Sequence, residues 1–197
     1  MAYCRWGVLA CAIVMIVAGC RSNTEPDTSH FKKAINDYYA VHPSCVWPSP
    51  VKFPTQVDAS NDAETKGFDA LTDAGLLTRK AEEKKRFLVG SKQVTDYDVS
   101  DKGRAAWAVD PAQPGYGNFC YGHRDVTTVD NFSNNQSGGN TVVVNYHYQL
   151  SGVPDWAKSA ETQTAFPTLQ ADLAMPKADT ATLMQTPSGW QVAAKQQ

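Results

Sequence analysis

The residue types that most often carry chemistry are few and scattered in this chain. The four histidines lie at positions 30, 42, 123 and 147. They form no His-x-x-x-His pair, and the cysteines form no Cys-x-x-Cys pair, the spacings that place two ligands on one metal ion. The sequence also lacks a Gly-x-Ser-x-Gly nucleophile turn. We therefore predict no metal site, no cofactor and no catalytic residue, with the His123 region as the candidate if the protein is an enzyme.

A short mixed segment in the second half of the chain is the first candidate for binding a partner. It combines an aromatic ring (Tyr121), an imidazole (His123), a cation (Arg124) and an anion (Asp125). It lies beside the clearest predicted strand, residues 141–150, and binding residues concentrate on polar segments that a rigid sheet supports.

The aromatic residues of this region have two interpretations. They either fill the core between sheet and helices or form an exposed patch for a partner or a glycan. They are Tyr116, Phe119, Tyr121, Tyr146 and Tyr148.

The stretch 130–140 is the second candidate for binding a partner, because it is rich in asparagine and glycine and reads as an exposed loop or a long hairpin tip. Asn134 and Asn135 would supply amides that adapt to a partner. The alternative is that this loop is only a variable tip, and that Arg124 and Asp125 satisfy each other.

A different chemistry is indicated at the start of the chain. One basic residue, Arg5, precedes an apolar run over residues 7–17, and two small residues then lead into Cys20. The run is about half of the ~20 residues that a membrane-spanning helix needs. This arrangement is typical of a cleaved secretory signal peptide, here residues 1–19.

Val17-Ala18-Gly19-Cys20 resembles the lipobox of bacterial lipoproteins. The resemblance implies that Cys20 is acylated and becomes the new N-terminus, so that the protein is bound to a membrane through its N-terminal lipid. Arg21 follows, where an aspartate would be the usual signal for inner-membrane retention in Gram-negative lipoproteins. The resemblance therefore implies the outer membrane, on its periplasmic face, with residues 20–28 as a tether. The alternatives are a retained N-terminal anchor and an ordinary cleaved signal.

Cys45 and Cys120 are the two thiols that remain after processing and lipidation. Two thiols in an oxidising compartment most often pair, so we predict a disulfide between them. The alternative is a reactive Cys120 next to His123.

Composition limits the partners. The chain has 197 residues and a formal net charge of −2. This balance provides no electrostatic reason to expect nucleic acid as a partner. The length after processing suits one domain or two small packed subdomains.

The first half of the mature chain reads as mostly helical. A helix begins at Ser29 and is stopped by Pro43, and a proline-rich extended stretch follows to Ser60. A second helix begins near Asn61 and ends at Gly75. Short strands over 86–89 and 94–99 and a helical stretch from Ser100 through Trp107 complete this half.

Two parts of that half resemble the second half of a winged-helix domain. They are the sequences ALTDAGLL at residues 70–77 and YDVSDKGR at residues 97–104, on either side of a predicted hairpin. DNA binding would require a basic recognition face and a cytoplasmic location, and neither is predicted. We interpret the resemblance as a scaffold only.

The second half reads as an antiparallel sheet, with strands over 118–121, 126–132 and 141–150 and a closing hairpin over 180–193. The predicted fold class is α+β. The predicted division is a helical, winged-helix-like subdomain over 29–109 and a β-rich subdomain over 110–197, with the boundary in a Pro- and Gly-rich stretch.

The predicted function is that of a membrane-tethered periplasmic lipoprotein that binds a protein partner or assists envelope assembly without catalysis. The alternatives are an immunity or inhibitor lipoprotein that blocks a cell-wall-degrading enzyme, and a periplasmic enzyme.

Overall fold

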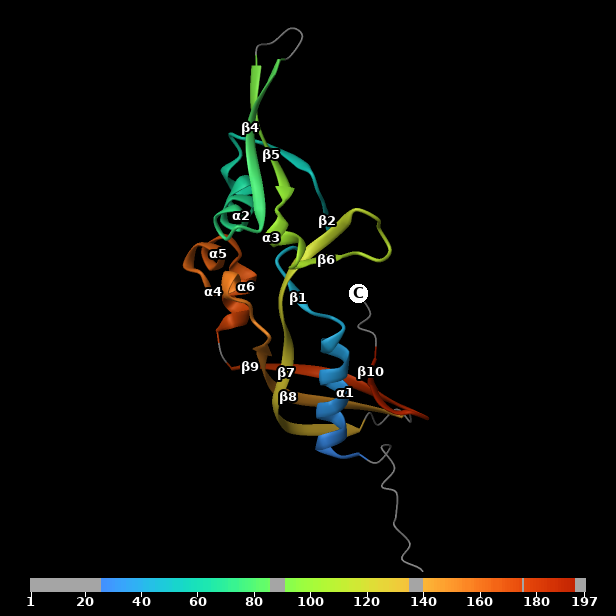
Figure 1. Cartoon of the computed structure of the whole chain (residues 1–197). Coiled ribbons are helices and arrows are strands. Elements are labelled where there is room, and N and C mark those ends of the chain that lie inside the picture. The colour runs from blue at the N-terminus through green and yellow to red at the C-terminus, as the bar shows by residue number, and fades with distance from the viewer. Residues whose placement is uncertain (1–25, 86–90, 135–139, 175, 194–197) are drawn as a thin grey trace, which may run out of the picture.

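The computed structural model describes residues 26–85, 91–134, 140–174 and 176–193. It is a mixed helix and sheet structure with a large curled antiparallel sheet (Figure 1). The helices are α1 (Thr28–Ala40), α2 (Asp62–Asp73), α3 (Asp101–Arg104), α4 (Asp155–Lys158), α5 (Ala160–Ala165) and α6 (Pro167–Leu173). The strands are β1 (Ser44–Cys45), β2 (Val51–Lys52), β3 (Thr55–Asp58), β4 (Leu77–Lys85), β5 (Ser91–Val99), β6 (Trp107–Val109), β7 (Tyr116–Asn134), β8 (Thr141–Ser151), β9 (Lys177–Thr186) and β10 (Gly189–Val192).

The larger sheet has seven strands and is organised around β7. The first part of β7 pairs with the short strands β1, β2 and β6, and the remainder pairs with β8. Strands β9 and β10 complete the order β1-β7-β8-β9-β10, and every pairing in it is antiparallel.

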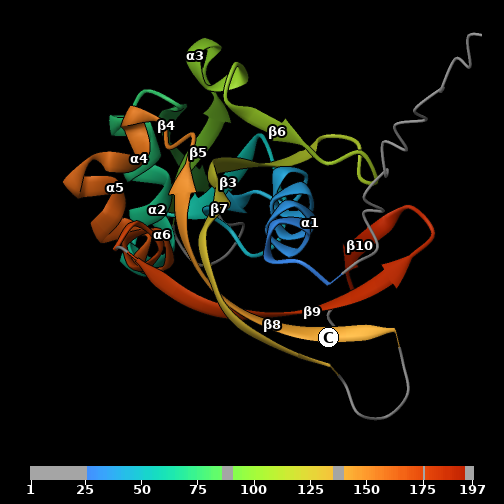
Figure 2. The ribbon, with the colours of Figure 1, turned by 90° about the horizontal axis from the view of Figure 1, so that it is seen from below.

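Helix α1 lies along the concave side of this curled sheet (Figure 2). Asp27 caps its first turn by accepting a hydrogen bond from the Ser29 amide at 2.7 Å. Phe31, Ala34 and Ile35 form its buried stripe, at the three-to-four spacing of an amphipathic helix. They pack against the alternate residues of β8 that face inward, namely Val142, Val144, Tyr146 and Tyr148.

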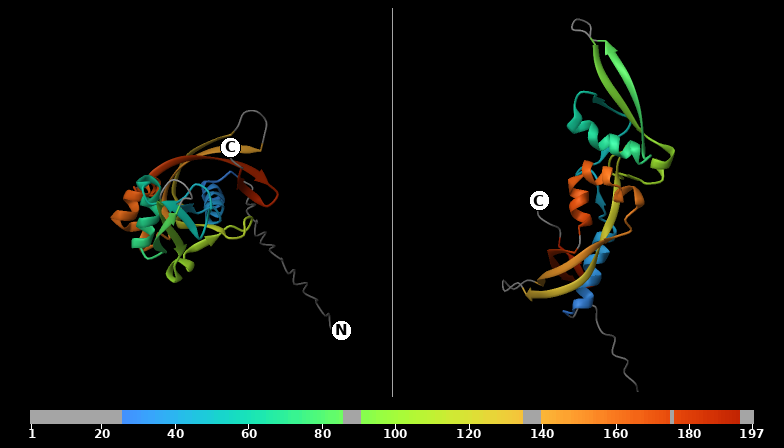
Figure 3. Two further views of the ribbon diagram at one scale, coloured as in Figure 1. Left: turned by 90° about the horizontal axis from the view of Figure 1, so that it is seen from above. Right: turned by 90° about the vertical axis from the view of Figure 1, so that its left-hand side faces the viewer.

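A second core lies under the smaller sheet, whose strand order is β3-β5-β4. Helix α2 packs on this sheet with Phe68 and Leu71. Helices α4, α5 and α6 lie beside α2 in both Figure 1 and the right-hand view of Figure 3, and Phe166 and Leu169 join the same core. The β4–β5 hairpin extends away from the rest of the molecule in these views.

Most of the predicted elements are confirmed. The predicted helices at Ser29 and Asn61, the strand over 141–150 and the closing hairpin all correspond to elements of the structure. The strand predicted over 94–99 lies within β5, whereas the strand predicted over 86–89 lies outside the described part of the chain.

Three local predictions were wrong. The strands over 118–121 and 126–132 are one continuous strand, because Gly122 pairs with Ser44 of β1 and residues 123–125 pair with β8 across the expected gap. The exposed loop expected over 130–140 is wrong for residues 130–134, which belong to β7 and pair with β8 as a long hairpin, the alternative expectation. Residues 135–139 lie outside the described part of the chain. The helix expected through Trp107 ends at Arg104, because Trp107 pairs with Phe119 in the sheet.

Each core takes residues from both sides of the predicted boundary at 109/110. The core around α2 includes Phe119 and Tyr121, and the core of the curled sheet includes Phe31 and Ile35. The first half of the chain supplies helices α1–α3 and strands β1–β6, so the mostly helical first half that was predicted is not confirmed.

Gly103 offers a test of how closely α3 packs. A Cβ atom at this position would lie 1.9 Å from the carbonyl oxygen of Leu76, a backbone atom that cannot rotate away. We expect Gly103→Ala to lower the free energy of unfolding by about 2 kcal/mol, because overpacking forces the backbone to shift. Arg104→Ala is the control, since it removes only an exposed ion pair with Asp101. Equal stability of the two variants in urea unfolding would contradict this packing.

Candidate functional site

The candidate segment 121–125 lies in the middle of β7, where this strand changes partners. Gly122 is opposite Ser44 of β1, and His123 begins the pairing with β8 opposite Ser151. This change of partner strand brings the backbones of β7 and β8 close together at Gly122. Gly122 has φ +141°, and a Cβ there would lie 2.8 Å from the Ser151 carbonyl oxygen. The segment is therefore at the junction of the two cores.

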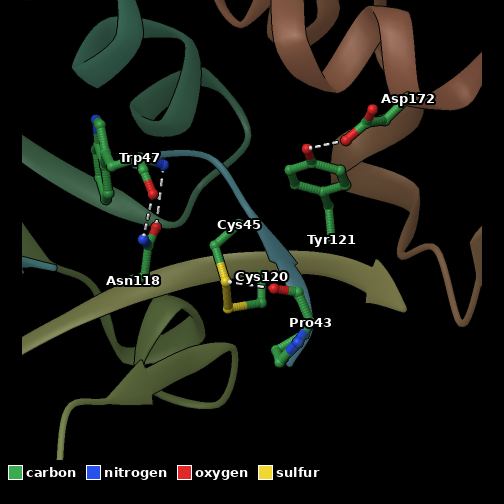
Figure 4. The surroundings of a disulfide bond; sticks show 7 residues. All are labelled: Pro43, Cys45, Trp47, Asn118, Cys120, Tyr121 and Asp172. Atoms are coloured by element: carbon green, nitrogen blue, oxygen red, sulfur yellow. Dashed lines mark hydrogen bonds between the residues drawn. A yellow bond between two sulfur atoms is a disulfide. The ribbon is translucent and has the colours of Figure 1, made fainter. Parts of the chain in front are cut away.

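The predicted disulfide between Cys45 and Cys120 is confirmed (Figure 4). The two residues face each other in the pairing of β1 with β7. Next to it, the Asn118 side chain donates to the Trp47 carbonyl at 2.7 Å and accepts from the Trp47 amide at 3.2 Å. The proline-rich segment is thus attached to β7 by one covalent bond and a two-way hydrogen bond.

Arg124 is the most heavily engaged candidate. Its guanidinium lies between two aromatic rings, 4.6 Å from the ring centroid of Tyr39 and 4.4 Å from that of Tyr148. It also donates to the Tyr39 hydroxyl at 2.9 Å and forms an ion pair with Asp179. Burial lowers the pKa of Arg124, but the neighbouring Tyr39 and Asp179 more than offset this and raise it above its usual range, so the side chain is always charged. Arg124 thereby connects α1, β7, β8 and β9.

Tyr146 lies beneath this cluster and is fully buried. Its hydroxyl has no hydrogen bond of standard geometry within the part of the chain that the structure describes. Burial, followed by the nearby Tyr39, raises the pKa of Tyr146 well above that of a free phenol, so the hydroxyl stays neutral.

Tyr121 connects β7 to α6. Its hydroxyl donates to the Asp172 carboxylate at 2.8 Å, and Lys177 forms an ion pair with the same carboxylate at 2.8 Å (Figure 4 shows the first contact). Burial, reinforced by the Asp172 carboxylate, raises the pKa of Tyr121 above its usual range. Of the five aromatic residues that were expected either in the core or in a patch, Phe119, Tyr121, Tyr146 and Tyr148 are buried in the core. Tyr116 is half-buried and belongs to neither core.

His123 and Asp125 also have partners inside the protein. The His123 Nε2 atom lies 2.8 Å from the Ser151 hydroxyl. Asp125 accepts from the Asn36 side-chain amide at 2.9 Å, and Asn36 in turn accepts from the Val126 amide at 2.8 Å. Asp125 and Arg124 are therefore held by other residues and do not pair with each other.

Four side chains of the candidate segment thus attach helices and strands to β7: those of Tyr121, His123, Arg124 and Asp125. This geometry supports a rigid frame for the curled sheet. Of the two candidate amides, Asn134 ends β7 opposite Val142, and Asn135 lies outside the described residues.

A groove that the sequence analysis missed lies between α2 and α5. It encloses about 580 Å³ and is floored by small side chains, among them Thr65, Ala70 and Ala165. Three carboxylates of α2 line it: Asp62, Asp69 and Asp73. They recur at seven- and four-residue steps and so share one helix face, which is the signal that could have identified them. The opposite wall could not be predicted, because nothing local indicates that α5 packs there.

Within the described residues, no group of three or more histidine, cysteine, aspartate or glutamate side chains is arranged to hold a metal ion. Among the helices that the structure describes, none is both long enough and apolar enough to cross a membrane.

No protein-family model, no curated protein and no solved structure matches this chain.

Proposed function

We propose that this protein is an exported lipoprotein whose domain binds a protein partner in the bacterial envelope without catalysing a reaction. Acylated Cys20 anchors it to the periplasmic face of the outer membrane. The proposal rests on the Val17-Ala18-Gly19-Cys20 sequence and on the position of the folded domain immediately after it.

The Cys45–Cys120 disulfide is the observation that carries the proposal. Disulfides persist in the periplasm and at cell surfaces, whereas cytosolic reductants keep most thiols reduced. A disulfide between the two cysteines that remain after processing therefore agrees with export, which the first twenty residues indicate independently.

The domain would lie close to the bilayer. Helix α1 begins at Thr28, eight positions after Cys20. An extended chain spans at most ~3.5 Å per residue, so the tether reaches roughly 28 Å. A partner is therefore expected to meet the domain at the membrane surface or within a short distance of it.

The winged-helix-like part, which includes α2, the β4–β5 hairpin and α3, serves in this proposal as a scaffold and binds no nucleic acid. Its charges support this interpretation, because basic side chains of the hairpin are paired with acidic ones. Arg79 pairs with Asp69 at 2.9 Å, and Lys80 pairs with Glu82 at 2.8 Å.

Cys20→Ser is the test of the anchor. We expect the wild-type protein to incorporate labelled palmitate in a Gram-negative host and to partition into the detergent phase. The Cys20→Ser variant should incorporate none and should remain unprocessed or become soluble, because only the cysteine thiol can accept the lipid.

Cys45→Ser is the matched control, since it removes a cysteine that lies inside the domain, where it is bonded to Cys120. It should retain both the label and the detergent partitioning. Partitioning of Cys20→Ser like that of the wild type, after cleavage of the signal, would overturn the proposed lipidation.

A further inference from the structure

The groove between α2 and α5 is built from one face of each helix (Figure 1 shows the two helices side by side). The residues from α2 that line it follow one another at three- and four-residue steps: Asp62, Thr65, Lys66, Asp69, Ala70 and Asp73. The opposite wall consists of Ala160, Glu161, Thr164 and Ala165. The far side of α2 is anchored in the core through Phe68 and Leu71, so this wall is rigid.

Small residues shape the groove: they leave space at its base and allow its two helices to pack closely. A Cβ at Gly67 would lie 3.1 Å from the ring of Phe166, so the absence of a side chain allows α2 to approach the end of α5. Thr65 and Ala70 are buried at its base. The floor is therefore formed largely by methyl groups, and a ligand that entered it would meet an apolar surface.

The rim is acidic. Asp62, Asp69, Asp73 and Glu161 face a single cation of the lining, Lys66. Asp69 is already engaged, because it forms an ion pair with Arg79 at 2.9 Å and accepts from the Tyr97 hydroxyl at 3.0 Å. Within the described residues, the other three carboxylates form no ion pair shorter than 4 Å.

Helix stability accounts for only part of these charges, because Asp62 and Glu161 lie in the first turns of α2 and α5, where a carboxylate favours the helix dipole. Asp73 is the last residue of α2, where a carboxylate opposes the helix dipole, and no basic residue occupies that last turn. Asp69 and Asp73 are four residues apart, a spacing at which like charges destabilise a helix. Arg79 offsets part of this repulsion, and the negative charge that remains on this face is available to a partner outside the chain.

We propose that the α2–α5 groove binds a lysine- or arginine-containing segment of a protein partner. The small or apolar side chains of that segment contact the methyl floor, and its cations pair with Asp62, Asp73 and Glu161. This inference rests on the proposed binding function and names the site and the chemistry of the partner.

The test uses the full-length mature protein in detergent micelles and a fluorescent peptide of alternating lysine and alanine. Fluorescence anisotropy should show binding that weakens as salt is added, because solvent-exposed charges are screened. A matched peptide of alternating glutamate and alanine should not bind.

Two charge variants should shift the affinity in opposite directions. Asp73→Asn combined with Glu161→Gln should weaken peptide binding about threefold to tenfold, the range expected for two solvent-exposed charge pairs. Lys66→Gln should strengthen it about twofold to threefold, because it removes the cation that repels the peptide. A loss of folding cannot mimic this gain.

The matched control is Asp37→Asn combined with Glu83→Gln. It also removes two negative charges, one from α1 and one from β4. These residues are exposed and lie outside the groove, so the affinity should stay within about twofold of the wild type. An equal loss in this control, or equal binding of the glutamate peptide, would overturn the proposal.

A second copy of the chain is the competing occupant, and sedimentation distinguishes it. A dimer that dissociates in the Asp73→Asn/Glu161→Gln variant would assign the groove to self-association and overturn the proposal. The lipidation test reads palmitate incorporation instead, so failure of the anchor and failure of the groove are separate results.

Discussion

Replacing both Cys45 and Cys120 by alanine is expected to lower the free energy of unfolding by about 4 kcal/mol. The two residues are 75 positions apart, and a covalent link that closes so long a loop restricts the unfolded chain strongly. The link is also needed locally, because β1 contributes only two residues to the sheet. Without it, the proline-rich segment would depend on hydrogen bonds, such as those between Asn118 and Trp47, to stay against β7.

Urea unfolding monitored by circular dichroism measures this loss. The wild-type protein unfolded under reducing conditions should match the Cys45→Ala/Cys120→Ala variant, because both lack the link. Asn118→Ala provides a comparison that removes the hydrogen bonds and keeps the disulfide. A double variant within 1 kcal/mol of the oxidised wild type would show that strain cancels the entropic gain.

Arg124→Met is expected to lower the free energy of unfolding by about 3 kcal/mol. Methionine retains much of the apolar stem but leaves Asp179 without the guanidinium in a site where the two side chains are only 22% and 30% exposed. The contacts of the cation with the rings of Tyr39 and Tyr148 are lost as well.

A double-mutant cycle with Asp179→Asn separates the ion pair from the ring contacts. Arg124→Met/Asp179→Asn should be more stable than the sum of the single effects implies, by about 1–2 kcal/mol. Arg124→Lys retains the charge but not the planar stacking, so it should fall between the wild type and Arg124→Met. Strict additivity in the cycle would contradict the importance of the pair.

Arg124→Met also tests whether Arg124 contacts a partner directly. Because Arg124 connects α1 to three strands, Arg124→Met is expected to weaken partner binding only as far as it destabilises the domain. Loss of binding in a variant that is as stable as the wild type would instead return this residue to the list of candidate contact residues.

The sequence by itself determined the elements whose signals are local. The apolar stripe that includes Phe31 and Ile35 predicts α1, the Asn61 cap marks the start of α2, and the alternation over 141–150 predicts both β8 and its buried face. The disulfide was predictable for a different reason, since the predicted processing and lipidation would leave Cys45 and Cys120 as the remaining pair.

Tertiary structure alone decided what depends on contacts between distant residues. It made one strand of β7, because pairing with β1 at Gly122 and with β8 from His123 onward compensates for the weak local signal of this segment. It gave Tyr121 and Arg124 partners 51 and 55 positions further along the chain, in Asp172 and Asp179. It also placed α5 opposite the acidic face of α2. Local periodicity shows which face of a helix is apolar, but only the packed chain determines what lies across from it.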